Sequence, residues 1–352
     1  MNLSHWGFEN YKNKIGGELG VKEELIGRVA VENRKNWILY TAFGEVEGII
    51  LKSFSRKSAM PKTGDWVLFK KLKGEKKVLL EKVLPRFSKI SRKDPKPGQA
   101  IEEQVIAANI DKAFLVQGLD NNFNLNRLER YLVAVRDGGV EPVVVFNKLD
   151  LNAGDSVLRK IKTRLAKEKV VLTSAKTGAG LKELAGLMKP GETAVFIGSS
   201  GVGKSSIINR FLKETVLPTK EVRGKDSKGR HTTTKRELFV LPEGFLVIDT
   251  PGMRELQILA SLDSVSDFFE EIEKMSSNCQ FSDCDHQSSK GCAILKAVEN
   301  KELSFERYKS WLKLKSEARF VEQKKSLDYQ REKKQFWKKV NKDFKTKEKL
   351  ES

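Results

Sequence analysis

The sequence predicts a multidomain protein with an all-β module first, an α/β domain in the middle and a metal-binding, helical module last. Three observations predict this order. Short strand-like runs fill residues 25–84, apolar runs alternate with helical patterns over residues 112–248, and all three cysteines cluster within residues 279–292. The expected boundaries are 1–87 for the first domain, 88–100 for a linker, 101–258 for the second domain and 259–352 for the third.

The first module is predicted to be a small β-barrel. Five runs rich in Val, Ile and aromatic residues are separated by turn signals such as Gly44-Glu45. Five short strands are typical of an OB-fold barrel, which binds oligonucleotides, although an SH3-like barrel fits the same pattern. We expect an RNA-binding OB-fold domain, followed by an exposed linker rich in proline and basic residues. The five runs are 25–33, 37–43, 46–52, 65–73 and 77–84.

The middle of the chain has the pattern of an α/β domain. Near-continuous apolar strands that alternate with helices indicate a mostly parallel sheet covered on both faces. Ligands of such sheets bind at the carboxyl ends of the strands. The expected strands are 112–116, 140–146, 170–173, 193–197, 236–241 and 245–248, and the expected helices are 102–109, 125–136, 156–168, 181–188 and 205–213.

A glycine-rich segment between an expected strand and an expected helix matches a phosphate-binding loop. Its glycines let backbone N–H groups turn toward phosphates, Lys204 can reach the β and γ oxygens, and the Ser205 hydroxyl can bind Mg²⁺. The sequence therefore predicts that a nucleoside triphosphate binds here with Mg²⁺. The expected nucleotide contacts are Gly198, Ser199, Ser200, Gly201, Val202, Gly203, Lys204, Ser205 and Ser206.

Two further segments indicate that the nucleotide is GTP. Asn147-Lys148-Leu149-Asp150 follows a strand, and a carboxylate at Asp150 accepts two hydrogen bonds that guanine can donate and adenine cannot. Asn147 would tie this segment to the phosphate loop, and Lys148 would cover the base. Ser174-Ala175-Lys176 would offer a backbone N–H to guanine O6. In Asp249-Thr250-Pro251-Gly252, Asp249 would hold the Mg²⁺ shell and Gly252 would approach the γ-phosphate.

The order of these segments is unusual. Ordinary GTPases place the phosphate loop first and the guanine-recognition segments last, whereas here Asn147 and Ser174 precede Gly198 and Asp249. The domain is therefore expected to be a circularly permuted P-loop GTPase. A permutation keeps every strand in the sheet, so the site can stay intact.

Three cysteines and one histidine form a compact cluster with the spacing of a metal site. Cys279, Cys284, His286 and Cys292 use every cysteine of the chain. Three thiolates and one imidazole give a closed tetrahedral Zn²⁺ site without an open position for water. We expect one structural zinc ion.

Charge and hydropathy narrow the class of protein. The net charge of +19 is carried mainly by residues 1–87 and 301–352, with +7 and +8, while the longer middle carries +4. Basic ends that also contain aromatic residues, such as Phe336-Trp337 among lysines, favour RNA binding, while the aromatic residues of 305–311 are expected to pack a core. The residues from 302 to about 343 are expected to form one or two helices. No apolar run is long enough to span a membrane, and we expect a cytoplasmic monomer.

Taken together, these motifs resemble the bacterial family of ribosome small-subunit-dependent GTPase A, the RsgA family. The resemblance rests on the permuted order, the segment Gly229-Arg230-His231-Thr232-Thr233-Thr234, the segment Asp249 to Leu256 and the following Cys/His cluster. It implies a GTPase that acts late in maturation of the small ribosomal subunit, binds its rRNA and is stimulated by that subunit.

The resemblance also implies roles for residues around Thr233. Thr233 is expected to bind Mg²⁺ and the γ-phosphate, with Thr232 and Thr234 as alternatives. Met253 occupies the place where many GTPases carry a water-orienting glutamine, and His231 resembles the family's catalytic histidine. A GTP-switched RNA-binding protein with incidental hydrolysis remains an alternative, and so does a GTPase that acts on tRNA or DNA.

Overall fold

The computed structural model describes residues 2–17, 20–54, 59–72, 77–93, 103–151, 154–212, 236–249 and 260–324. The chain divides into two compact units. The first comprises Met1–Arg92 and Val105–Gln257, and the second comprises Lys93–Gln104 and Ile258–Ser352. Each unit is described by itself, and the boundaries of the three expected domains stay predictions.

All five expected strands of the first module form, and they close into a barrel. The hydrogen-bonded order is β1-β2-β3-β5-β4, and β4 pairs back with β1. The β3–β5 pairing is parallel and the other pairings are antiparallel, an arrangement that matches the Greek-key barrel of the OB fold. The strands are β1 (Ile26–Glu32), β2 (Trp37–Thr41), β3 (Gly44–Ile49), β4 (Trp66–Lys71) and β5 (Lys77–Val83).

The barrel has its own apolar core and a helical cover. Alternate side chains of its strands, among them Val29, Leu39 and Phe69, point inward and are fully buried. Helix α1 (Phe8–Ile15) packs the rings of Phe8 and Tyr11 against Trp66, and Trp6 of the N-terminal turn η1 (Leu3–Trp6) stacks on Tyr40 of β2. The fully buried Trp66 therefore holds the N-terminal helix against the barrel.

The expected parallel sheet is also present. Its strands lie in the order β10-β9-β8-β11-β13, and each neighbouring pair is parallel. Strand β12 (Glu237–Val240) pairs antiparallel with β13 and lies between β13 and β1 of the barrel. The parallel strands are β8 (Lys112–Gly118), β9 (Glu141–Asn147), β10 (Val170–Leu172), β11 (Thr193–Ile197) and β13 (Leu246–Asp249).

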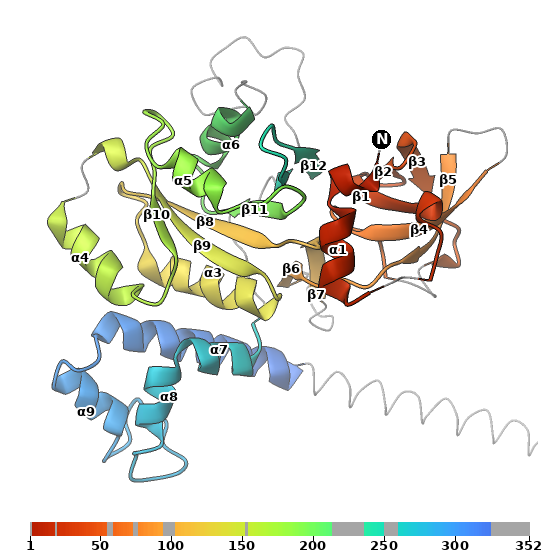
Figure 1. The fold of residues 1–352 in the computed structure, drawn as a ribbon. Helices are drawn as coiled ribbons and strands as arrows, with labels where there is room; N and C mark the ends of the chain where they lie inside the picture. Colours follow the sequence, from red (N-terminus) through yellow and green to blue (C-terminus); the bar gives the residue numbers. More distant parts are fainter. Residues whose placement is uncertain are drawn as a thin grey trace, which may run out of the picture. The chain divides into compact units, whose positions relative to one another are not determined.

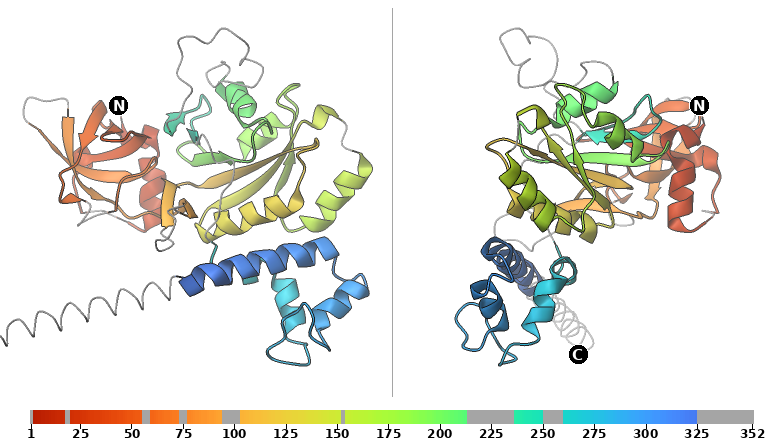
Figure 2. Two further views of the ribbon diagram at one scale, coloured as in Figure 1. Left: turned by 180° about the vertical axis from the view of Figure 1, so that it is seen from behind. Right: turned by 60° about the vertical axis from the view of Figure 1, so that its left-hand side comes forward.

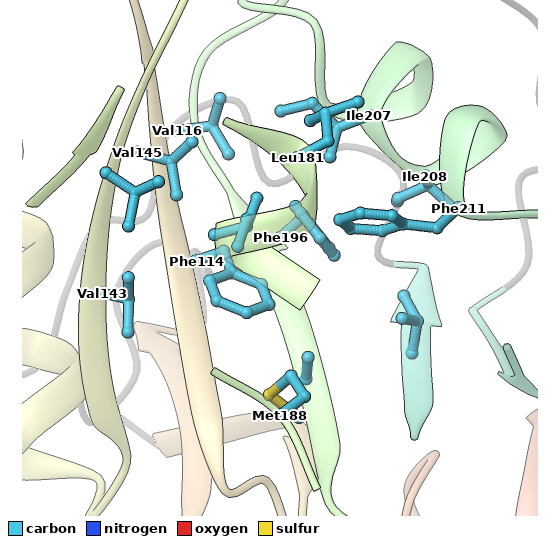
Figure 3. Packing of buried hydrophobic residues seen from close by; sticks show 14 of the residues in the cluster. Phe114, Val116, Val143, Val145, Leu181, Met188, Phe196, Ile207, Ile208 and Phe211 are labelled. Carbon is cyan, nitrogen blue, oxygen red and sulfur yellow. The ribbon is translucent and has the colours of Figure 1, made fainter. Parts of the chain in front are cut away.

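Helices cover both faces of this sheet. Helices α3 (Leu125–Asp137) and α4 (Asp155–Arg164) lie on one face, and α5 (Leu181–Gly186) and α6 (Lys204–Leu212) lie on the other (Figures 1 and 2). Figure 3 shows how α5 and α6 bury their apolar side chains against β8, β9 and β11. This close-packed core holds the carboxyl ends of these strands in place. Its members include Phe114, Val116, Val143, Val145, Leu181, Phe196, Ile207, Ile208 and Phe211.

The expectation of a helix over residues 102–109 is wrong. The segment forms strand β7 (Glu103–Ala108), which pairs with β6 (Lys89–Lys93). Eight residues are short for an isolated helix, and the β-branched Val105 and Ile106 favour an extended chain. Burial of the end of β7 decides the outcome, because a strand can place Ile106, Ala107 and Ala108 in the interior.

A buried arginine joins the barrel to the parallel sheet within the first unit. Arg28 donates hydrogen bonds to the carbonyls of Trp6 (2.5 Å) and Asn109 (3.1 Å) and to the Thr193 hydroxyl (2.7 Å). Burial lowers the pKa of Arg28 to about 10, and the nearby Asp111 and Asp65 oppose that shift. Strand β1 also pairs with β12, so the barrel and the α/β sheet form one continuous hydrogen-bonded ladder.

The second unit is small and helical. Its core is formed by α7, α8, α9 and a longer helix over residues 305–324. Tyr308 and Trp311 of that helix are buried as expected, but Phe305 is 52% exposed, so the expectation that it packs in the core is wrong. No helix in the described ranges is long and apolar enough to span a membrane. The three short helices are α7 (Leu262–Phe268), α8 (Glu270–Ser276) and α9 (Ala293–Glu299).

Candidate nucleotide and metal sites

The expected nucleotide segments gather at one edge of the parallel sheet. Asn147 ends β9, Ser174 follows β10, Gly198 follows β11 and Asp249 ends β13. These strands are mutually parallel, so their carboxyl ends meet at the same edge. Segments more than a hundred residues apart in sequence thus surround one site.

Asn147 connects the base segment to the phosphate loop. Its buried amide nitrogen donates to the carbonyl of Val202 at 2.9 Å, and its amide oxygen accepts from the backbone N–H of Ala175 at 2.9 Å. Gly203 passes so close that a Cβ there would lie 2.1 Å from the Asn147 nitrogen. Only glycine fits that position, which also has a φ of +98°.

The side chain of Asp150 is held in place by a neighbouring strand end. The Ser174 hydroxyl donates to Asp150 Oδ1 at 2.5 Å, and this hydrogen bond lowers the pKa of the exposed carboxyl. Asp150 therefore carries its charge at neutral pH, as an acceptor for two N–H groups of a base must. Arg210 of α6 steadies the adjoining loop through the carbonyls of Ala175 (2.9 Å) and Lys176 (2.6 Å).

The phosphate loop opens directly into helix α6, which begins at Lys204. The Lys204 ammonium donates to the carbonyls of Gly198 (2.7 Å) and Ser199 (2.9 Å), so its charge is held over the loop. Ser205 and Ser206 follow in the first turn of the helix. A helix N-terminus that begins with a lysine is suited to an anion with several phosphate groups.

Part of the expected site lies outside the described residues. His231, Thr232, Thr233 and Thr234 fall there, and so do Gly252 and Met253. Their roles stay predictions. Asp249 is described, at the end of β13, on the edge that carries the phosphate loop.

The sequence motifs missed one loop at this edge. Residues 119–124 connect β8 to α3, and Asp120 and Asn122 contact the base segment and the phosphate loop, respectively. A signal was available, because polar residues directly follow β8, another strand of the same parallel sheet. These residues match no known motif, so the sequence motifs did not predict them as part of the site.

The four expected metal ligands come together in the second unit. One donor atom from each of Cys279, Cys284, His286 and Cys292 lies within 4.8 Å of the others. The Nδ1 atom of His286 is 3.6 Å from the Cys279 sulfur and 3.8 Å from the Cys292 sulfur. Donors about 2.0 to 2.3 Å from a tetrahedral Zn²⁺ have similar mutual distances. The donor set therefore fits a metal ion of this kind.

Burial and the longer helix set the surroundings of the cluster. Burial raises the pKa of the Cys292 thiol to about 11, so binding as a thiolate requires a positive charge that displaces its proton. The longer helix supports His286, whose carbonyl accepts from the Tyr308 hydroxyl at 2.7 Å and whose ring lies 5.4 Å from that of Trp311. The Trp311 indole in turn donates to Glu273 at 2.8 Å.

Comparisons with known proteins agree with this arrangement. The RsgA GTPase family matches residues 83–259, and a family described as 50S ribosome-binding GTPases matches residues 193–334, which begin just before the phosphate loop. The small ribosomal subunit biogenesis GTPase RsgA of Opitutus terrae is 38% identical, covering 100% of this chain and 99% of that protein. RsgA 1 of Oceanobacillus iheyensis is 37% identical, covering 90% and 92%.

A solved structure shows the same fold. The crystal structure of YloQ, described as a circularly permuted GTPase, has a TM-score of 0.59 and 23% identity, and the match covers 86% of this chain and 97% of that one. The permuted order expected from the motifs is confirmed at the level of the fold.

Proposed function

This chain belongs to the RsgA GTPase family, and on that premise we propose that it couples GTP hydrolysis to a late step in assembly of the small ribosomal subunit. The chain is a GTPase with a circularly permuted domain. The observation that carries the nucleotide-binding part of the proposal is the contact between the base segment and the phosphate loop, from Asn147 to Val202 at 2.9 Å. Relatives that match over their whole length carry the name of a small-subunit biogenesis factor.

The proposed nucleotide site follows from the sheet edge. Asp150 would accept hydrogen bonds from guanine. Lys148 and the segment from Ser174 to Lys176 would surround the base. Residues 198–206 would hold the phosphates. Ser205, Asp249 and Thr233 would hold Mg²⁺, which when bound neutralises charge on the β and γ phosphates. His231 would orient the attacking water.

We propose that Cys279, Cys284, His286 and Cys292 hold one Zn²⁺ ion. Four protein donors leave no coordination position for water, so the metal would stabilise the fold and take no part in hydrolysis. The barrel and the basic C-terminal residues would contact rRNA through phosphate charge and base stacking. Such a protein would work in the cytoplasm, as a monomer on its subunit.

Steady-state hydrolysis with and without purified small ribosomal subunits tests the proposal. We expect slow GTP hydrolysis by the protein alone, strong stimulation by small subunits and no comparable stimulation with ATP. Large subunits serve as the control for nonspecific RNA effects. GTP hydrolysis that small subunits do not change would contradict the ribosomal part and leave the GTPase assignment intact.

A substitution tests whether hydrolysis matters. His231→Ala is expected to retain GTP binding, to lose most of the stimulated hydrolysis and to stay bound to small subunits in a pelleting assay. Normal release of this variant would favour the alternative in which GTP only switches RNA binding.

A further inference from the structure

The loop between β8 and α3 occupies a central place at the nucleotide edge. Strand β8 lies between β9, which carries the base segment, and β11, which carries the phosphate loop. Residues 119–124 therefore leave the sheet between the two halves of the site. The backbone N–H of Leu119 donates to the carbonyl of Asn147 at 2.9 Å, so this loop starts in direct contact with the base segment.

Asp120 holds the lysine of the base segment. The Lys148 ammonium donates to Asp120 Oδ2 at 2.6 Å, and the backbone N–H of Asn122 donates to Oδ1 at 3.0 Å. Partial burial raises the pKa of Asp120, but these hydrogen bonds outweigh it and leave the pKa below its usual value. Lys148 has a left-handed backbone with φ of 69°, a conformation that a side chain bearing a Cβ adopts at some cost. The ion pair with Asp120 holds the Lys148 side chain in one position.

The same loop reaches the phosphate loop. The Asn122 amide donates to the carbonyl of Ser200 at 3.3 Å, and its amide oxygen accepts from Arg127 at 3.0 Å. Asn124 caps helix α3 through the backbone N–H of Arg127 at 2.9 Å. Both ends of the loop are thus anchored by hydrogen bonds within the protein.

We propose that Asp120 is a positioning residue of the guanine site. It holds the Lys148 ammonium so that the aliphatic part of the lysine forms a ready wall for the purine ring. The loop then links that wall to the phosphate loop through Asn122. This inference rests on the proposed assignment of residues 147–150 as the base segment. The ligand class is a guanosine nucleotide, and the effect is expected to be similar for GDP and GTP because Asp120 acts on the base side.

Binding of fluorescent N-methylanthraniloyl GDP and GTP to the full-length protein tests the proposal. In Asp120→Asn the charged acceptor is lost, and we expect the dissociation constant of both nucleotides to rise roughly tenfold. KM for GTP should rise while kcat at saturating GTP is retained. Asp120→Glu, which restores the carboxylate, should recover part of the affinity.

A double-mutant cycle separates positioning from general damage. If Asp120 acts through Lys148, adding Asp120→Asn to Lys148→Met should cause little further loss. The matched control is Glu141→Gln, which removes an exposed carboxylate paired with Lys112 at 3.5 Å at the opposite end of β9. This control should bind nucleotide like the wild type.

The possible failures differ. If Lys148→Met and Asp150→Asn leave nucleotide affinity unchanged, the base-segment assignment is wrong. If both weaken binding but Asp120→Asn does not, only the present inference is overturned. An equal effect of Asp120→Asn with and without Lys148 would also overturn it, because Asp120 would then act through the general stability of the loop.

Discussion

The two compact units are stabilised by different means. The first has one apolar core in the α/β sheet that carries the nucleotide segments and a second core inside the barrel. Its buried Arg28 forms hydrogen bonds with the elements around it. The second has three helices of seven residues each and a longer helix over residues 305–324, and it contains a cluster of four side chains that could hold a metal ion. The short helices are marginal by themselves in water. We therefore expect the first unit to fold through burial, and the second to depend on metal ligation in addition to its buried side chains.

Removal of the metal should have the largest effect, and it should affect the second unit far more than the first. Structural zinc sites contribute on the order of 10 kcal/mol to folding, and the seven-residue helices α8 and α9 beside the cluster are too short to be stable by themselves. We expect chelation, or Cys292→Ser, to abolish helical structure around α8 and α9 while nucleotide binding by the first unit persists. Circular dichroism, zinc content and guanosine nucleotide binding measure the three quantities.

Ser289→Ala is a suitable control, since it changes the same polar loop without removing a ligand. Metal-free protein that keeps its full helical signal would show that the second unit folds by burial after all.

Arg28→Met should cause the next largest effect, and only in the first unit. The variant leaves the carbonyls of Trp6 and Asn109 without their buried donor and removes the positive charge near Asp111 and Asp65. Loss of one partner from such a buried network costs about 3 to 5 kcal/mol. Urea unfolding followed by nucleotide release would report this loss.

Arg159→Ala provides the comparison, because Arg159 is an exposed arginine on α4 that donates only to a helix carbonyl at 3.4 Å. Its free energy of unfolding should stay within about 0.5 kcal/mol of the wild type. Equal effects of the two substitutions would mean that the junction carries little of the stability of the first unit.

The smallest expected effect is a pH dependence at the same junction. Tyr40 stacks on Trp6 and donates to the carbonyl of Leu238 at 3.3 Å, and burial raises its pKa from 10.0 to about 12. The folded state thus favours the neutral phenol. Its contribution is complete below the ordinary pKa of about 10 and is lost as the pH rises through the folded value.

Tyr40→Phe should therefore lose less stability than the wild type when the pH is raised above 10. Urea midpoints of both proteins on either side of that pH give the difference. Parallel curves would show that the phenol is not protected by the fold.

The sequence alone was sufficient for much of the architecture. Period-two and near-continuous apolar runs predicted the barrel strands and the parallel strands, because burial of alternate or of all side chains is a local property of the pattern. The glycine-rich loop and the Cys/His spacing predicted their sites for a similar reason, since the chemistry requires given residue types at short separations. Residues 102–109 were wrongly predicted as a helix because eight residues carry too little periodicity to separate helix from strand.

Only the tertiary structure decided which distant residues meet. In the sequence Arg28 is one basic residue among many, and only the fold brings the carbonyls of Trp6 and Asn109 and the hydroxyl of Thr193 to it. Asp120 and Lys148, at 2.6 Å, are 28 residues apart and share no motif. Their contact depends on the order of strands in the sheet, which the long-range pairing of strands determines. Local sequence therefore determined the elements and the ligand chemistry, and the packing of the sheet determined the partners of each charged group.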